Sequence, residues 1–430
     1  TEHINKALLP LDNKAIISHL IEKTPIDYDI VVVLGYKGNL VRDYCQAAHP
    51  NRNFIFVEVD KYEGEVNRYS LIFNIEQSQD HFDFGKKMES LDNKYEGEGA
   101  GPGYSIKQAK EYLQRPFIWV TADTIITDKL PPAEYNWLGL YPTGIPELYS
   151  TAEVKDGLVI NFKNKSKSGF TNAFIGLAGV YDYTNFWNNI EDSEIVSAYY
   201  DIKKYSEVKE HQFDWYDVGT VDNYIKAQKI FKDSVAYSIP KTNGEFLYKV
   251  DNTFIKISSD NNFISGRINR SKELSGLVPT LNYSGENLYS YDWREGKTLY
   301  DCDIEILKNF LVFCEKEMWK PIGSDLDCSD FYKNKTMNRL EMFLSNRDDS
   351  YKKTHNVNGV EVESIEHLIN KFDWDSVLNG NPTKIFHGDL QFDNVVYGDD
   401  DKFYLIDWRQ DFNGESVGDM YYDLAKMYGG

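Results

Sequence analysis

Continuous apolar runs alternate with helical patterns along the first half of the chain. The apolar runs cover residues 28–36, 53–60 and 115–126, and helical patterns cover residues 37–48 and 103–114. An unbroken apolar run is typical of a strand buried on both faces, and alternation of such strands with helices predicts a mostly parallel sheet. We therefore expect an α/β domain whose ligands bind beyond the carboxyl ends of the strands.

The pattern changes at residues 233–244, where a Pro, a Gly and small polar residues gather. Residues 245–258 predict a β-hairpin, because two strand-like runs flank the two-residue turn Asp251–Asn252. Residues 261–277 predict a helix, and most of the later chain has helical patterns up to residue 369. We expect two domains, at residues 1–235 and 236–430.

The length of the chain indicates the number of domains, and its charge excludes some classes of binding partner. A chain of 430 residues is long enough for two or three domains with separate cores. Its formal net charge of −21 argues against nucleic acids and anionic membranes as partners, because their phosphates require clustered Lys and Arg. Nucleotides remain compatible with an acidic protein, because Mg²⁺ neutralises much of their charge.

The four cysteines, Cys45, Cys302, Cys314 and Cys328, form no C-x-x-C pair. This spacing argues against a disulfide scaffold or a zinc site and favours a reducing cytoplasm, and Cys314 lies in an apolar run that predicts a core position. No apolar run approaches the roughly 20 residues of a membrane span, and no signal peptide is recognisable. Because the sequence starts at Thr1 without a methionine, we expect an upstream segment.

The strongest motif is His387-x-Asp389-x-x-x-x-Asn394, followed along the chain by Asp407 in "YLIDW". A carboxylate on a loop can accept the proton of an attacking hydroxyl group, and a nearby amide can hold a metal ion. A second carboxylate, brought close by the hairpin-like segment between Asn394 and Asp407, can bind the same metal beside ATP phosphates. Phosphoryl transfer requires mainly such positioning and charge neutralisation.

These residues resemble the aminoglycoside phosphotransferase and choline kinase family, whose members are related to protein kinases. The resemblance implies that Asp389 is the catalytic base, that Asn394 and Asp407 bind Mg²⁺, and that His387 supports the catalytic loop. It also implies a two-lobed, protein-kinase-like α+β domain. The family usually continues beyond the matched segment with helices that help to bind the alcohol.

In the same resemblance, a small lobe covers residues of about 243–290 and a large lobe residues of about 295–430. Lys256 matches the lysine that contacts ATP phosphates, and Glu273 matches, more weakly, its ion-pair partner. The segment 289–300 is similar to the connection between the lobes. No clear Gly-rich phosphate loop is present, so a kinase-like domain without activity stays open as an alternative.

Five stretches of the first half resemble nucleotidyltransferases that make sugar nucleotides and CDP-alcohols. They are "NKALLPLDNKAIISHLIEK", "GPGYSIKQAKEYL", "TADT", "GLVINFKNKS" and "FDWYDVGTVDNYIKAQ". Such enzymes let a phosphate monoester attack the α-phosphate of an NTP, so their site needs a divalent metal and several cations. The resemblance implies a Rossmann-like fold and the following residues: Asp123 and Asp217 for Mg²⁺, Lys6 for the triphosphate, Lys165 for the acceptor phosphate, and Lys14, Gly101 and Gly103 for the nucleotide.

One expected element is missing from the match. The family has a Gly-rich loop, G-x-G-x-R, about ten residues before the stretch that "NKALLP" matches, and this loop cradles the triphosphate through backbone N–H groups. We expect the loop, and the strand that leads into it, upstream of Thr1.

A kinase half and a nucleotidyltransferase half predict consecutive reactions in one cytoplasmic enzyme. ATP would phosphorylate a sugar or small alcohol, and CTP, UTP or GTP would convert the phosphate into an NDP-linked donor for bacterial capsule, lipopolysaccharide or teichoic acid. The choice between choline and a sugar stays open, as does association with further copies of the chain. Two alternatives remain: a nucleotidyltransferase with a regulatory kinase-like domain, and a non-catalytic scaffold of two degenerate domains.

Overall fold

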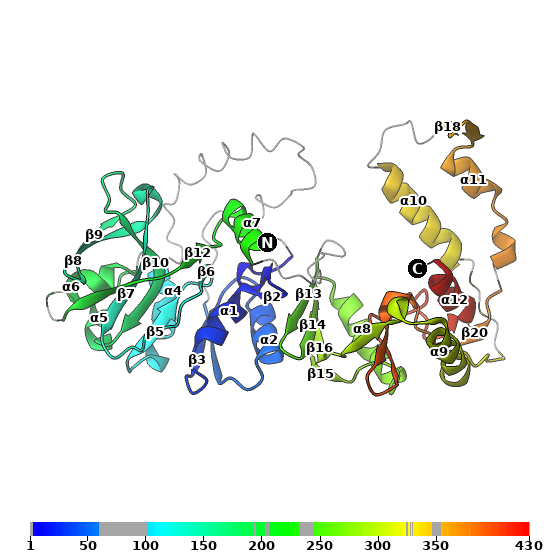
Figure 1. The fold of residues 1–430 in the computed structure, drawn as a ribbon, viewed down its shortest axis with the longest axis horizontal. Coiled ribbons are helices and arrows are strands. Elements are labelled where there is room, and N and C mark those ends of the chain that lie inside the picture. Colours follow the sequence, from blue (N-terminus) through cyan, green and yellow to red (C-terminus); the bar gives the residue numbers. More distant parts are fainter. Residues whose placement is uncertain are drawn as a thin grey trace. The chain divides into compact units, whose positions relative to one another are not determined.

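The computed structural model describes residues 3–59, 102–192, 195–202, 204, 206–231, 244–323, 326, 328, 330–345, 354–377 and 379–429. They form a mixed α/β structure (Figure 1). Contacts divide the chain into two compact units, the first comprising residues 1–259 with 287–290, and the second residues 260–286 with 291–430. Residues 244–259 thus belong with the first unit by their contacts.

A six-stranded sheet forms the centre of the first unit, in the order β5-β10-β7-β11-β9-β8. Its pairs are antiparallel except for β7 and β11, which run parallel. The expectation of a mostly parallel sheet is therefore wrong for this sheet. The strands are β5 (Phe117–Val120), β7 (Asn136–Pro142), β8 (Ser150–Lys155), β9 (Leu158–Asn164), β10 (Asn172–Val180) and β11 (Val208–Gln212).

A tight turn explains part of the antiparallel pairing. β8 and β9 are joined by Asp156 and Gly157, whose φ angles are 51° and 76°. Two consecutive residues with positive φ form the turn that matches the twist of a hairpin, and Asp-Gly suits it well. A connection of two residues cannot cross over a sheet, so β8 and β9 have to run antiparallel.

The main core of the first unit lies where helices cover this sheet. Trp119 and Leu140 of the sheet belong to one buried cluster with Phe186 of α5 (Tyr183–Asn189) and Tyr199 of α6 (Ser197–Ile202). α5 and α6 lie beside the sheet in Figure 1. Phe117 packs edge to face on Phe186, with 5.4 Å between the ring centroids.

Smaller elements of the first unit surround the candidate site. β3 and β4 pair in parallel, as the alternating pattern predicts, and β6 pairs antiparallel with β12. The elements are η1 (Lys6–Leu8), β1 (Pro10–Leu11), β2 (Lys14–Ala15), α1 (Ile16–Lys23), β3 (Ile30–Leu34), α2 (Gly38–Ala48), β4 (Phe54–Glu58), α4 (Pro102–Gln108), η3 (Lys110–Tyr112), β6 (Thr124–Ile126), η4 (Pro146–Leu148), β12 (Trp215–Asp217) and α7 (Val221–Ile230).

The predicted hairpin is present as β13 (Glu245–Val250) and β14 (Thr253–Ser258), with Asp251 in the turn at a φ of 49°. It packs on the start of the chain. The hydroxyl of Tyr248 donates a hydrogen bond to the carbonyl oxygen of Leu8 at 2.5 Å, and its ring contacts that of Tyr44 at 5.0 Å between centroids. The backbone N–H of Lys249 donates to the carbonyl of Asn13 at 2.7 Å.

The second unit contains the predicted helix α8 (Asn261–Glu273), further helices and short strands. An exposed hairpin, β18 (His355–Val357) with β19 (Val360–Val362), interrupts the expected helical stretch. The buried side chain of Cys314 confirms its predicted core position. The remaining elements are β15 (Leu281–Ser284), β16 (Leu288–Asp292, shared between the units), β17 (Gly296–Thr298), η5 (Leu299–Asp301), α9 (Ile304–Glu317), η6 (Asp330–Asn334), α10 (Lys335–Ser345), α11 (Ile365–Lys371), η8 (Trp374–Val377), β20 (Pro382–Thr383), η9 (Phe392–Asn394), β21 (Val395–Gly398), β22 (Phe403–Leu405), β23 (Gly418–Asp419) and α12 (Met420–Gly429).

Within the described ranges, no helix has the length and the apolar character needed to span a bilayer.

Candidate functional sites

A pocket of about 370 Å³ in the first unit brings together residues that are distant in sequence. Asp123, Lys165 and Asp217 all line it. Asp123 lies in the turn between β5 and β6, and Asp217 ends β12. Because β6 and β12 pair with Asp217 opposite Thr124, the sheet register brings Asp217 next to the turn that carries Asp123.

The two carboxylates and one lysine converge on Gly219. A Cβ atom built at Gly219 would lie 2.8 Å from Asp217 Oδ1, 3.3 Å from Asp123 Oδ2 and 3.6 Å from Lys6 Nζ. Lys6 forms an ion pair with Asp123, with 2.7 Å between Nζ and Oδ2. Burial of Asp123 opposes its charge, but Lys6 outweighs this effect and holds the pKa of the carboxyl below its ordinary value.

Three neighbours orient Asp217, and two of them have no counterpart in the sequence predictions. Gly219 donates its backbone N–H to Oδ1 at 2.7 Å. Asn223 Nδ2 and the hydroxyl of Tyr149 donate to Oδ2 at 3.0 Å and 3.2 Å. Burial and the charge of Asp217 raise the pKa of Tyr149 to about 12, so its hydroxyl stays a donor. Asn223 follows the "YDVGT" stretch closely, but no local signal marks Tyr149.

Apolar side chains, among them Trp119, Phe174 and Val196, line the pocket together with small polar ones such as Thr121 and Ser150. Lys165 adds a cation; it directly follows β9, at the end of the β8–β9 hairpin away from the Asp156–Gly157 turn. Its φ of 41° lies in the left-handed region, and its backbone N–H donates to the carbonyl of Tyr149 at 3.1 Å. The pocket therefore combines charged, small polar and apolar side chains, which is typical of small-molecule sites.

Two predicted nucleotide-binding residues lie outside the lining of this pocket. Lys14 does not line the pocket and forms an ion pair with Glu22, with 2.5 Å between Nζ and Oε2. Gly103 also does not line it, and a Cβ atom there would lie 1.8 Å from the carbonyl oxygen of Glu191. Gly103 thus permits close packing of α4 against the backbone. Gly101 lies outside the described residues.

In the second unit, His387 connects the loop of Asp389 to the segment that carries Asp407. Its side chain is fully buried. Its Nε2 lies 3.0 Å from the carbonyl oxygen of Ile406, and its Nδ1 lies 3.3 Å from the backbone nitrogen of Asp389. Burial lowers the pKa of His387 to about 4, so the ring is neutral at pH 7. A neutral ring that donates through Nε2 and accepts through Nδ1 satisfies both contacts.

Asp389 lies at the surface of this loop with one cation and one amide beside it. Its Oδ1 pairs with Nζ of Lys426 at 2.8 Å. Asn394 Nδ2 donates to the backbone carbonyl of Asp389 at 2.7 Å. This contact uses the NH₂ group of Asn394 and leaves its amide oxygen for another partner. Asn394 and Asp389 therefore share one short loop, as their spacing predicts.

Asp407 has a neighbour that sequence patterns did not indicate. Its Oδ1 forms an ion pair with Nη1 of Arg267 on α8, and the φ of Asp407 is 57°. The indole N–H of Trp408 donates to the backbone carbonyl of Arg267 at 2.9 Å, which fixes α8 beside this segment. Arg267 is almost completely buried.

Lys256 and Glu273 each form an ion pair with a residue of their own unit. Glu273 pairs with Arg270, three residues earlier on the same helix. Lys256 pairs with Glu245, with 3.0 Å between Nζ and Oε2. Glu245 lies diagonally across the β13–β14 ladder on the same face, so the cross-strand neighbour supplies the carboxylate. A pairing of Lys256 with Glu273 stays a prediction.

Asp423 on α12 is a further residue at this site. Its fully buried carboxylate accepts the backbone N–H groups of His387 at 2.9 Å and Gly388 at 2.7 Å, and the indole N–H of Trp319 at 3.3 Å. Burial raises the pKa of Asp423 to about 6, although the N–H donors favour its charged form. Asp423 thus stabilises the backbone of the loop that carries Asp389.

Replacement of Asp423 with Ala is expected to destabilise the second unit by roughly 2–4 kcal/mol, because buried N–H donors lose their acceptor. Urea unfolding would measure the change. Asp399→Ala, in the exposed turn between β21 and β22, is the matched control. Equal midpoints for the two variants in the transition of the second unit would refute this role of Asp423.

Both sites offer oxygen donors suited to Mg²⁺. Asp123 and Asp217 form one set, and Asp407 with the free amide oxygen of Asn394 forms the other. Within the described part of the chain, no three His, Cys, Asp or Glu side chains gather as a metal cluster. Mg²⁺ commonly takes one or two carboxylates and completes its coordination with substrate phosphates and water, so two donors per site are compatible with it.

Neither the known protein-family models nor the curated protein sequences include a match to this chain. Solved structures of nucleotidyltransferases are similar to part of it. HddC from Yersinia pseudotuberculosis is 16% identical with a TM-score of 0.37, over 54% of this chain and 91% of that chain. The inositol-1-phosphate CTP transferase from T. maritima is 13% identical with a TM-score of 0.35, over 54% and 89%.

A UTP-bound UGPase from Acinetobacter baumannii is 12% identical with a TM-score of 0.35, over 56% of this chain and 88% of that chain. Likeness at this level carries no argument about the fold or the function of this chain.

Proposed function

We propose that the first unit transfers a nucleotidyl group from CTP, UTP or GTP to a phosphate monoester. The observation that carries this proposal is the convergence of Asp123, Asp217 and Lys6 on Gly219, beside Lys165 in one pocket. An oxygen of the monoester would form a bond to the α-phosphorus, and the bond from this phosphorus to the α–β bridging oxygen would break, releasing pyrophosphate. Lys6 and Lys165 would neutralise the two anions that have to meet.

Asp123 and Asp217 would hold Mg²⁺, which would supply charge neutralisation for the triphosphate when bound. Asn223 and Tyr149 would keep Asp217 in the ligating orientation. Lys6 would exchange its contact with Asp123 for a contact with phosphate oxygens.

The predicted large lobe of the kinase-like domain, at residues of about 295–430 within the second unit, would make the monoester from ATP and a free alcohol or sugar. Asp389 would accept the proton of the hydroxyl group while the hydroxyl oxygen forms a bond to the γ-phosphorus. The bond from the γ-phosphorus to the β–γ bridging oxygen would break, and ADP would leave with the electron pair. Asn394 and Asp407 would hold Mg²⁺ for the ATP phosphates. NDP-linked products of this kind serve as donors for bacterial surface glycans.

Product analysis of the full chain tests this proposal. The protein would be incubated with ATP, one of CTP, UTP, GTP or dTTP, and a panel of sugars and amino-alcohols, followed by mass spectrometry. ADP, pyrophosphate and an NDP-linked alcohol are expected together. Absence of pyrophosphate with every phosphate monoester and NTP would refute the first activity.

A second candidate is a nucleotidyltransferase whose kinase-like unit has no activity. The ion pair of Asp407 with the buried Arg267 favours it, because the guanidinium occupies one oxygen that a metal would use. Conversion of phosphate monoesters without conversion of any alcohol would select this candidate.

Gly219→Ala is expected to reduce nucleotidyl transfer roughly 10²-fold, the scale of an error of about 1 Å at a reacting centre. The added methyl group would lie 2.8 Å from Asp217 Oδ1 and push this carboxylate away. Pyrophosphate release measures the effect. Gly144→Ala is the matched control, because its added Cβ would meet nothing within 4 Å. Equal rates for both variants would contradict the proposed carboxylate site.

A further inference from the structure

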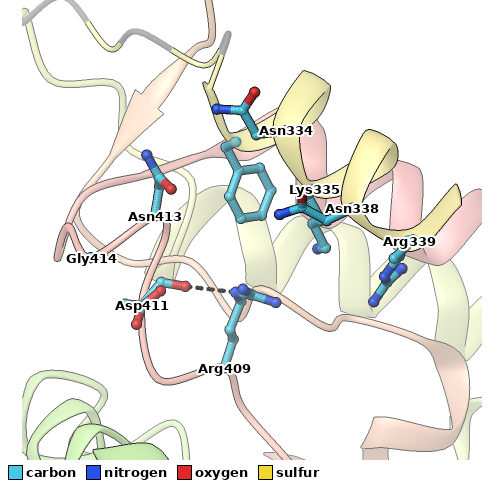
Figure 2. A pocket seen from close by; sticks show the side chains of 9 residues that line it. Asn334, Lys335, Asn338, Arg339, Arg409, Asp411, Asn413 and Gly414 are labelled. Atoms are coloured by element: carbon cyan, nitrogen blue, oxygen red, sulfur yellow. Dashed lines mark hydrogen bonds between the residues drawn. The ribbon is translucent and has the colours of Figure 1, made fainter. Parts of the chain in front are cut away.

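The second unit contains a cavity of about 500 Å³ next to the loop of Asp389. Figure 2 shows Lys335, Asn338 and Arg339 of α10 on one side of it, and the loop with Arg409 and Asp411 on the other. Lys335, Arg339 and Arg409 are cationic, and Asp411 is the one carboxylate that lines this cavity. The cavity is therefore basic, although the whole chain has a net charge of −21.

Arg409 connects this cavity to the proposed catalytic loop. Its backbone N–H donates to the carbonyl of His387 at 2.9 Å. A Cβ atom at Gly388 would lie 2.5 Å from Cβ of Arg409, so the two segments are in tight contact. The Nε–H of Arg409 donates to the backbone carbonyl of Asp411 at 2.8 Å, and this contact leaves the Asp411 carboxylate free of Arg409.

The cations of the cavity are poorly compensated. Among the described residues, Arg339 forms no hydrogen bond or ion pair. Lys335 lies over the rings of Phe331 and Tyr422, at 4.5 Å and 4.6 Å from their centroids, with no carboxylate within ion-pair distance. Burial, followed by repulsion from Arg409, Arg339 and Lys426, lowers the pKa of Lys335 to about 7, and Asp389 opposes this shift.

We propose that this cavity binds an oxyanion group, a carboxylate or a phosphate ester, on the alcohol that the second unit phosphorylates. The inference rests on the proposed kinase function and specifies its acceptor: a hydroxy acid, a sugar acid or an alcohol that already carries a phosphate. A cationic amino-alcohol such as choline is excluded, because three cations line the cavity. Arg339 and Arg409 bind the oxyanion and leave the hydroxyl group near Asp389.

Matched acceptors test the charge preference. ADP release from ATP by the full chain would be compared for glycerol, glycerate, glycerol 3-phosphate and choline, and for glucose, glucuronate and glucose 6-phosphate. At least one acidic member is expected to exceed its neutral counterpart by about 10- to 100-fold in kcat/KM, the range of hydrogen bonds to charged groups. The carboxylate and phosphate arms show which oxyanion is preferred. Faster turnover of choline, glycerol or glucose would overturn the inference and leave the kinase function standing.

Direct binding separates the inference from the kinase function. Glycerate, glucuronate and inorganic phosphate would be titrated calorimetrically into the protein without ATP. Arg339→Gln and Arg409→Gln are each expected to weaken binding about tenfold or more, with an unchanged KM for ATP. Lys333→Gln removes the same charge from an exposed position outside the cavity and is the control. Absence of oxyanion binding at 1:1 stoichiometry, or equal binding by all three variants, would overturn the inference even if ADP is released.

The pH dependence adds an independent readout. A bound carboxylate raises the pKa of Lys335, so affinity is complete below pH of about 7 and falls as pH rises above it. Arg339, Arg409, Lys426, Asp389 and Tyr422 are the charged and titratable groups that face Lys335. Glycerate is the suitable probe because its carboxylate does not titrate in this range. Affinity that stays constant between pH 6 and 9 would contradict a direct contact with Lys335.

Discussion

We expect the Asp389→Asn variant to lose ATP-dependent phosphorylation of the acceptor by roughly 10²–10⁴-fold, the contribution typical of a general base. The amide has the same size and can still accept a hydrogen bond from Lys426, which lies 2.8 Å away in the native protein. It cannot accept the proton of the hydroxyl group. ADP release with the acceptor found by product analysis measures the loss, and the affinity for ATP is expected to stay within a few fold.

The same variant tests whether the two reactions are consecutive and independent. Given the alcohol, it is expected to make no NDP-linked product. Given the phosphate monoester and an NTP, it is expected to work at the native rate. Asp399→Asn is the control, because this exposed carboxylate lies in the β21–β22 turn. Failure with the monoester, in a variant that remains folded, would show that the two sites are not independent enzymes.

Asp123→Ala and Asp217→Ala are each expected to reduce nucleotidyl transfer by roughly 10²-fold or more, the scale of losing one preorganised electrostatic contact. Both carboxylates lie within 3.3 Å of one point, the Cβ position of Gly219. If they hold one ion, the second replacement has little left to remove, so the double variant is expected to resemble the single ones. Pyrophosphate release under saturating NTP is the measurement.

Asp222→Asn provides the control, because this exposed residue lies in the first turn of α7, close to Asp217 in sequence. A double variant whose loss equals the product of the two single losses would argue that the carboxylates act separately. An unchanged rate of pyrophosphate release in the Asp217→Ala variant would show that Asp217 does not belong to the catalytic site.

Local patterns predicted several of the individual elements. β3, α2 and β4 lie within the residues predicted from the apolar runs, and the β13–β14 hairpin has the predicted turn. The convergence of Asp123 and Asp217 follows from strand-end positions and motif order, which sequence can supply. The apolar runs and the hairpin turn are local signals. The motifs of Asp123 and Asp217 mark strand ends that lie at the same edge of the structure.

The remaining features depend on contacts between distant segments. Tyr149 contacts Asp217 because of the position of β8 in the fold. No residue near Tyr149 in the sequence indicates this contact. Arg267 meets Asp407 because α8 lies beside this segment. The parallel prediction was wrong for the six-stranded sheet because apolar runs report burial of a strand but not its direction. For the same reason, a glycine such as Gly103 can be identified while its packing partner stays unknown.

The β13–β14 hairpin has a consequence for how this gene can recombine. Residues 244–259 follow the composition change, yet Tyr248 contacts Leu8 and Tyr44 of the first unit. A crossover between residues 231 and 244 would separate Tyr248 from both partners and uncover the buried ring of Tyr44. It would also separate Lys256 from the rest of the first unit. Recombinants cut there therefore inherit a first unit without β13 and β14.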